Sequence, residues 1–140
     1  MKIYNAEELI LGRLASVVAK ELLLGEDVVI INCEKAVISG RKENLVAREN
    51  WKRSLTGYPL KTPSRSRLPD RFVRLVVRRM LPWKIARGKE AYKHVMCYRG
   101  IPEEFQGKEM LTVKGASAQK LPILHRMQVG ALCKSIGGHF

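Results

Sequence analysis

Residues 27–34 read DVVIINCE, and the apolar run VVII at 28–31 is the strongest indication of the fold. Its side chains are β-branched and do not alternate with polar ones. This pattern predicts a strand buried on both faces, as in a parallel sheet. Parallel strands need a crossover connection, which is usually a helix. A helix and a second strand are therefore expected beside this run.

The residues that precede the run supply both elements. KIYNA at 2–6 predicts a short strand, and the apolar residues of 11–22 recur at helical spacing before Gly25 ends the helix. Strand, helix and strand form a βαβ unit, whose crossover is expected to be right-handed. Further helices are expected over about 41–51, 71–81 and 85–95 and near the C-terminus, and short strands near 36–38 and 95–100. One α/β domain spanning 1–140, built around a small, mostly parallel sheet, accounts for this order.

Positive charge concentrates in the middle of the chain. The protein has 26 Lys and Arg residues and 13 Asp and Glu residues, a net charge of +13. Residues 41–93 hold 16 of the basic residues and 4 of the acidic ones, so this segment alone has a net charge of +12. Gathered like charges oppose compaction. The pattern predicts a polyanionic partner, with nucleic acid the first candidate and an anionic membrane surface the second.

The helix expected from residue 71 carries part of this charge. Helical spacing places Arg71, Arg74 and Arg78 together, opposite an apolar stripe that ends at Met80. The planar guanidinium suits phosphate, and no acidic residue stands among these arginines. We expect Asp70 to cap the helix and Pro82 to follow its end, with Met80 and Leu81 in the core.

Two neighbouring stretches extend the basic segment. Residues 52–68 contain two prolines, are followed by a third at Pro69 and show no periodicity, which predicts an extended basic loop that becomes ordered on RNA. In RRMLPWK at 78–84, Trp83 lies at a corner between two basic helices. Packing at this corner is the preferred interpretation of Trp83, and direct RNA contact is the alternative.

The sequence offers little for an enzyme or a metal centre. Leu11 to Ser16 read LGRLAS, which lacks the glycine pattern of a dinucleotide site, and no Walker loop is present. The three histidines lack zinc-ligand spacing, and Cys33, Cys97 and Cys133 form no CxxC pair, so reduced, partly buried thiols are expected. No secretory signal or membrane span is expected either. Neither the aromatic strand motif of an RRM nor GXXG occurs, which favours recognition of RNA by shape and backbone.

Several motifs together carry a family resemblance. GRLAS at 12–16, VVIINCEKAVISG at 28–40, RRMLPWK at 78–84 and YRGIPEEF at 98–105 resemble the large-subunit ribosomal protein L13 family. IPEEF stands where bacterial members carry a His-Pro-His segment, so the archaeal and eukaryotic-cytoplasmic version is the one resembled. The resemblance implies a three-layer α/β/α fold with about four strands in its sheet. It also implies a structural role in the large subunit, contacts with large-subunit rRNA and neighbouring ribosomal proteins, and no catalysis.

The sequence therefore predicts a non-enzymatic rRNA-binding protein of the large ribosomal subunit, in the cytoplasm, that supports subunit assembly by neutralising phosphates. We expect no cofactor, metal, membrane or small-molecule substrate, one copy per ribosome, and a monomer when free. A DNA-compacting protein and a motif-free nucleotide enzyme remain the alternatives. The residues expected to bind rRNA are Arg41, Lys42, Arg48, Lys52, Arg53, Lys61, Arg65, Arg67, Arg71, Arg74, Arg78, Arg79, Lys84, Arg87, Lys89 and Lys93. The candidates for base stacking are Trp51, Tyr58 and Trp83.

Overall fold

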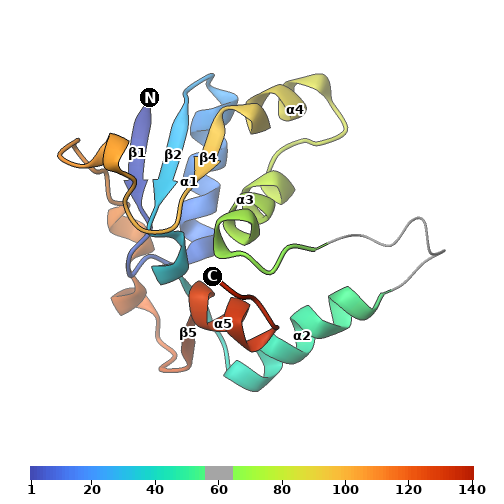
Figure 1. Ribbon diagram of the computed structural model, residues 1–140. Coiled ribbons are helices and arrows are strands. Elements are labelled where there is room, and N and C mark those ends of the chain that lie inside the picture. Colours follow the sequence, from blue (N-terminus) through green and yellow to red (C-terminus); the bar gives the residue numbers. More distant parts are fainter. Residues whose placement is uncertain (56–64) are drawn as a thin grey trace.

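The computed structural model describes residues 1–55 and 65–140 and has a three-stranded parallel sheet at its centre (Figure 1). The strands are β1 (Lys2–Asn5), β2 (Val28–Ile31) and β4 (Val95–Cys97), in the order β1-β2-β4. Both pairings are parallel. Helix α1 (Leu11–Leu23) connects β1 to β2 and completes the expected βαβ unit.

Both faces of β2 are buried, which explains why its apolar run is unbroken. Val28 and Ile30 belong to the main core, together with residues of α1 and of α3 (Pro69–Met80). Val29 and Ile31 belong to a second cluster on the other face, where Phe105 covers them. That face is covered by the 3-10 helix η3 (Glu103–Phe105) and irregular chain, whereas α1 and α3 form the helical layer (Figure 1). The expected α/β class is therefore confirmed. One outer layer consists of helices, and the other consists of η3 and irregular chain.

The fourth strand expected in the central sheet lies elsewhere. After β2 the chain enters a 3-10 turn, η1 (Cys33–Lys35), through Asn32, whose backbone is left-handed at φ 54°. This turn redirects the chain, so β3 (Val37–Ser39) pairs antiparallel with β5 (Arg126–Gln128) in a separate two-stranded sheet. In the part of the chain that is described, the central sheet thus has three strands and not four.

Helix boundaries differ from the expected ones at three places. Helix α2 (Lys42–Ser54) continues past the expected end, where basic residues in its last turn suit the negative end of the helix dipole. Helix α3 begins at Pro69, since proline is well suited to a first helical turn, so Asp70 lies inside that turn and is not the N-cap. The chain becomes extended at Leu81, and this directs the Leu81 side chain into the core, as expected. Met80 is 41% exposed, so the prediction that Met80 lies in the core was wrong.

Two helices and two short turns complete the described chain. Helix α4 (Ala86–Lys93) precedes β4, and α5 (Val129–Ser135) follows β5 directly. The 3-10 turns η4 (Lys114–Ala116) and η5 (Ala118–Lys120) lie in the irregular stretch before β5. None of the described helices combines the length and the apolar character that crossing a membrane requires.

Candidate nucleic-acid interface

Helix α3 has one buried face and two different basic sides. Val73 and Val77 are fully buried in the core. Arg71, Arg74 and Arg78 recur at the spacing of a single helical side, as the sequence predicted. Arg79 lies about 100° further round the helix and lines a cavity beside α2 instead. Arg79 therefore lies on a different side of α3 from Arg71, Arg74 and Arg78.

Two of these arginines lie over aromatic rings. The Arg78 guanidinium carbon is 3.8 Å from the centre of the Trp83 ring, and that of Arg74 is 4.7 Å from the centre of the Tyr92 ring. Trp83 and Tyr92 also contact each other edge to face, with centroids 5.4 Å apart. A guanidinium that lies over a ring can still direct N–H groups away from the ring, and these are the groups that bind phosphate. The arrangement therefore holds both guanidinium groups in position with their charge uncompensated.

The corner that carries Trp83 depends on one glycine. A Cβ atom added at Gly88, in α4, would overlap the backbone carbonyl of Pro82. Glycine lets α4 pack directly against the Pro82 turn, so Trp83 and Tyr92 come within contact distance. Trp83 is 36% exposed and contacts Tyr92 and Arg78, so it packs at the corner, as preferred from the sequence, with part of its surface exposed.

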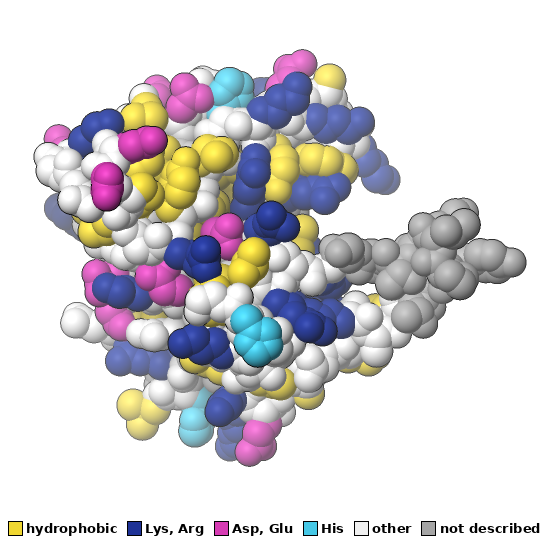
Figure 2. Space-filling model, viewed as in Figure 1, with side chains coloured by type: hydrophobic (Ala, Val, Ile, Leu, Met, Phe, Trp, Pro, Cys, Tyr) yellow, Lys and Arg dark blue, Asp and Glu magenta, His cyan; other side chains and the backbone are white. Residues whose placement is uncertain are grey.

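Among the described residues, the basic residues of α3 and α4 lack carboxylate partners. Within residues 1–55 and 65–140, no ion pair involves the seven residues that we call the α3–α4 cations. They are Arg71, Arg74, Arg78, Lys84, Arg87, Lys89 and Lys93. Arg87 donates a hydrogen bond of 2.8 Å to the Leu23 carbonyl, which neutralises no charge. Figure 2 shows Lys and Arg side chains along α4 and over the region between α4 and α2.

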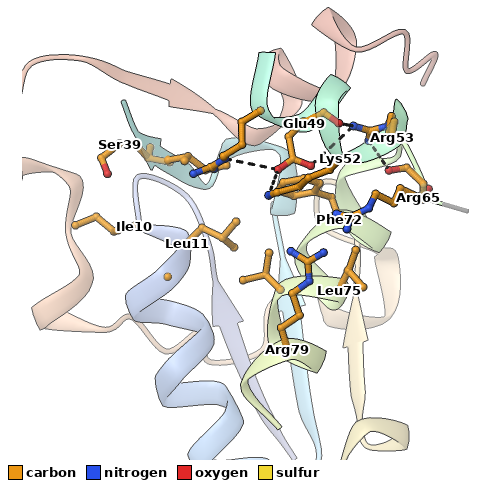
Figure 3. A pocket seen from close by; sticks show the side chains of 16 residues that line it. Ile10, Leu11, Ser39, Glu49, Lys52, Arg53, Arg65, Phe72, Leu75 and Arg79 are labelled. Atoms are coloured by element: carbon orange, nitrogen blue, oxygen red, sulfur yellow. Dashed lines mark hydrogen bonds and ion pairs between the residues drawn. The ribbon is translucent and has the colours of Figure 1, made fainter. Parts of the chain in front are cut away.

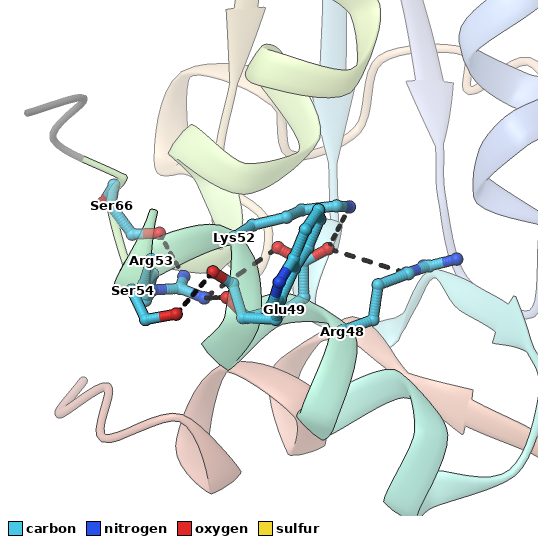
Figure 4. Close-up of polar contacts among 7 residues, drawn as sticks. Arg48, Glu49, Lys52, Arg53, Ser54 and Ser66 are labelled. Atoms are coloured by element: carbon cyan, nitrogen blue, oxygen red, sulfur yellow. Dashed lines mark hydrogen bonds and ion pairs between the residues drawn. The ribbon is translucent and has the colours of Figure 1, made fainter. Parts of the chain in front are cut away.

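A second group of cations surrounds one buried carboxylate in α2 (Figure 4). Glu49 is 4% exposed and accepts a hydrogen bond of 2.7 Å from Lys52. Arg53 and Arg48 approach the same carboxylate at 3.8 Å and 3.9 Å. Arg53 also donates to the carbonyl of Ser66 at 3.1 Å, which ties the chain before α3 to α2. Burial lowers the pKa of Arg53, Glu49 opposes this shift, and the nearby positive charges of Arg67 and Arg65 add to it.

This cluster corrects the expected extended loop. Lys52 and Arg53 belong to the last turn of α2 and bind Glu49, so they are not part of a free arm. The spacing of Glu49, Lys52 and Arg53 is i, i+3 and i+4, which places them on one helix side and could have indicated the pairing. What the sequence did not indicate is that Glu49 is buried.

A cavity of about 320 Å³ opens beside this cluster, between the first turn of α1, the end of α2 and one side of α3 (Figure 3). We call it the α1–α2–α3 pocket. Part of its wall is apolar and is formed by Leu11, Phe72, Leu75 and Val76. Its polar part contains Glu49 and the five cations Arg48, Lys52, Arg53, Arg65 and Arg79. Cations outnumber carboxylates here as well.

The remaining residues predicted to contact RNA are exposed where the structure describes them. Arg41, Lys42 and Arg67 are exposed, and Trp51 is 60% exposed on α2. Lys61 and Tyr58 lie outside the described residues.

No group of three or more His, Cys, Asp or Glu side chains in the described segments has the geometry to hold a metal ion. The described cysteines are free thiols, as expected, and Cys33 and Cys133 are buried.

Comparison with known proteins gives consistent matches. The model of a family described as ribosomal protein L13 matches residues 1–104. The large ribosomal subunit protein uL13 of Methanopyrus kandleri is 42% identical over 138 residues, which cover 96% of this chain and 86% of that protein. The uL13 proteins of Methanococcoides burtonii and Methanocaldococcus jannaschii are 41% and 37% identical, and each match covers both chains completely.

Proposed function

The chain belongs to the ribosomal protein L13 family, and we propose that, as a structural protein of the large ribosomal subunit, it binds rRNA through the α3–α4 cations. Its relatives are named as ribosomal proteins and not as enzymes. The resemblance to the archaeal version of the family agrees with the archaeal sources of these relatives. rRNA and neighbouring ribosomal proteins are the partners that this role requires.

The observation that carries the proposal is the pairing of Arg74 and Arg78 with aromatic rings. An arginine that stabilises a fold by charge is expected opposite a carboxylate. Here both guanidinium groups are oriented by stacking, and their positive charge remains available. Oriented arginines are well suited to bind phosphate oxygens with two parallel hydrogen bonds. The α3–α4 cations would therefore neutralise phosphates and recognise the shape of folded rRNA, which supports assembly of the subunit.

A salt titration tests this mechanism. Neutralising roughly 6–10 phosphates releases their counterions, so affinity should fall by about 10³–10⁵ between 50 and 200 mM salt. The measurement is filter binding of the full chain to a large-subunit rRNA transcript at increasing KCl concentration. A flat titration would show that phosphate contacts do not carry the affinity.

The DNA-compacting alternative makes a different prediction. A protein that recognises folded rRNA should prefer the rRNA transcript over duplex DNA of equal phosphate number, whereas a compacting protein should bind both alike. Competition between the two nucleic acids distinguishes these cases.

We also propose one copy per large subunit, a monomer in the free state and no small-molecule substrate. Sedimentation of the free protein and quantification of the chain in purified subunits test the first two points.

A further inference from the structure

The α1–α2–α3 pocket has features that the α3–α4 cations do not explain. The pocket is lined by five cations and by one carboxylate, that of Glu49. This carboxylate already accepts a hydrogen bond from Lys52. The excess of positive charge makes an anion the complementary ligand.

The glycine at the mouth of the pocket gives independent support. Gly12 lines the pocket within the first turn of α1. A Cβ atom at this position would meet nothing within 4 Å, and the backbone does not need a positive φ. Glycine disfavours a helix and here serves neither packing nor conformation. Helix α1 also lacks a side-chain cap, because Ile10 occupies the N-cap, so its first amides remain accessible to an anion.

The remaining wall of the pocket indicates which anion fits. Phe72, Leu75 and Val76 provide an apolar surface beside the cations. The volume of about 320 Å³ lies at the lower end of the range for small-ligand sites. A nucleotide combines a phosphate with a flat base that prefers an apolar surface. An acidic peptide would satisfy the charges and leave this wall uncovered.

We propose that the pocket receives one unpaired nucleotide of the bound RNA. The arginines and the first amides of α1 hold its phosphate, and its base lies against Phe72 and Leu75. Arg79 lines the pocket and directly follows Arg78 of the α3–α4 cations. One RNA strand can therefore contact both sides of α3. This inference rests on the proposed rRNA binding and adds a preference for unpaired nucleotides.

Two matched glycine variants test the pocket. Gly12→Leu adds a side chain to a residue that lines the pocket, whereas Gly115→Leu adds the same side chain in η4, which contacts the start of α1 through Arg13 but does not line the pocket. A Cβ atom meets nothing within 4 Å at either position and neither glycine has a positive φ, so both variants should fold. Gly12→Leu should not lower the melting temperature, because leucine favours a helix more than glycine does.

The binding probes are single-stranded oligouridylate and a fully paired RNA duplex with the same number of phosphates. Gly12→Leu should weaken binding of the single strand about tenfold, the loss expected for one stacked base, and leave duplex binding unchanged. Gly115→Leu should leave both unchanged. Equal affinity of Gly12→Leu and the wild type for oligouridylate would overturn the inference.

Further arms separate the sources of the ligand. Free uridine 5′-monophosphate should bind the pocket more weakly than oligouridylate, and tighter binding would assign the pocket to a free nucleotide and overturn the proposal. Polyglutamate that binds the wild type but not Gly12→Leu would assign it to an acidic peptide, with the same consequence. The variant Arg74→Glu with Arg78→Glu should weaken both RNAs. If it weakens neither while Gly12→Leu weakens the single strand, the proposed role of the α3–α4 cations fails and the pocket stands.

Discussion

The βαβ unit and the α3–α4 region use charge in opposite ways. In the βαβ unit the charge of Lys2 is matched by a carboxylate: Glu21 accepts hydrogen bonds from Lys2 at 3.2 Å and from Tyr4 at 2.7 Å. Beside this unit, Lys35 lies 2.8 Å from Glu7. In α3, Arg74 and Arg78 lie over aromatic rings, and no carboxylate of the described residues pairs with the arginines of α3 and α4.

The difference separates residues that stabilise the fold from residues that serve a partner. Surface ion pairs contribute little to stability, and their main effect in the βαβ unit is to cancel charge. Uncancelled charge in α3 and α4 repels itself and contributes little to folding beyond the contacts of Arg74 and Arg78 with aromatic rings. Substitutions in the two regions should therefore affect different measurements, and each prediction below tests that separation.

The largest expected effect is on stability, in the βαβ unit. Ile30 is fully buried in β2, so Ile30→Ala should lower the free energy of unfolding by about 4 kcal/mol through lost burial and the cavity left behind. Urea denaturation measures this change. Below the melting temperature, the affinity of the folded protein for rRNA should stay at the wild-type value. A folded Ile30→Ala protein with weaker RNA binding would break the separation.

The next effect is on RNA binding, in α3. Arg74→Glu with Arg78→Glu should weaken rRNA binding by about 10²–10⁴-fold, since two charge-assisted hydrogen bonds of roughly 1.5–3 kcal/mol each are lost. Filter binding measures the affinity, and the salt slope should also decrease by about 2. Stability should fall by only about 1 kcal/mol, because only the two contacts with aromatic rings are lost.

The control for that variant must carry the same change in net charge. Lys114 and Lys120 are exposed and lie outside the basic segment. Lys114→Glu with Lys120→Glu should therefore weaken rRNA binding far less than the α3 variant. Equal losses in the two variants would mean that total charge, and not the position of the arginines, determines the affinity. A collapsed thermal melt of the α3 variant would instead identify Arg74 and Arg78 as structural.

The sequence indicated the elements whose signal is local. The unbroken VVII run predicted a strand buried on both faces, and β2 has this environment because the sheet is covered on both sides. The helical spacing of Arg71, Arg74 and Arg78 likewise predicted one helix side. Met80 followed the same apolar spacing, yet it is exposed because α3 ends there and the next residue turns inward. Periodicity cannot show where a helix ends and which residue then enters the core.

Features that combine distant segments were beyond the reach of sequence patterns. The α1–α2–α3 pocket brings the turn at Gly12 together with Glu49 of α2 and Phe72 of α3. No spacing along the chain encodes that proximity. The partners of the arginines were hidden for the same reason, because Tyr92 reaches Arg74 only through the close packing of α4 on the Pro82 turn. Tertiary packing decided these contacts.

The smallest effect is a loss of stability at alkaline pH, and it sharpens the comparison because guanidinium groups do not titrate there. Burial raises the pKa of Cys133 to about 11, and burial and the hydrogen bond to Glu21 raise that of Tyr4 to about 12. Each group stabilises the fold fully below its unfolded pKa, 9.0 for cysteine and 10.0 for tyrosine, and that stabilisation is lost as pH rises through the folded pKa.

Thermal melts from pH 7 to 11 should therefore show a constant melting temperature up to about pH 9 and then a decline, with each such group costing about 1.4 kcal/mol per pH unit. Cys133→Ala should make the decline between pH 9 and 11 shallower, and Tyr4→Phe should do so only above pH 10. Slopes identical to the wild type in both variants would show that ionisation of these buried groups does not limit stability. The arginines of α3 remain charged over this pH range. The loss of stability therefore comes from the two core groups and not from the α3–α4 cations.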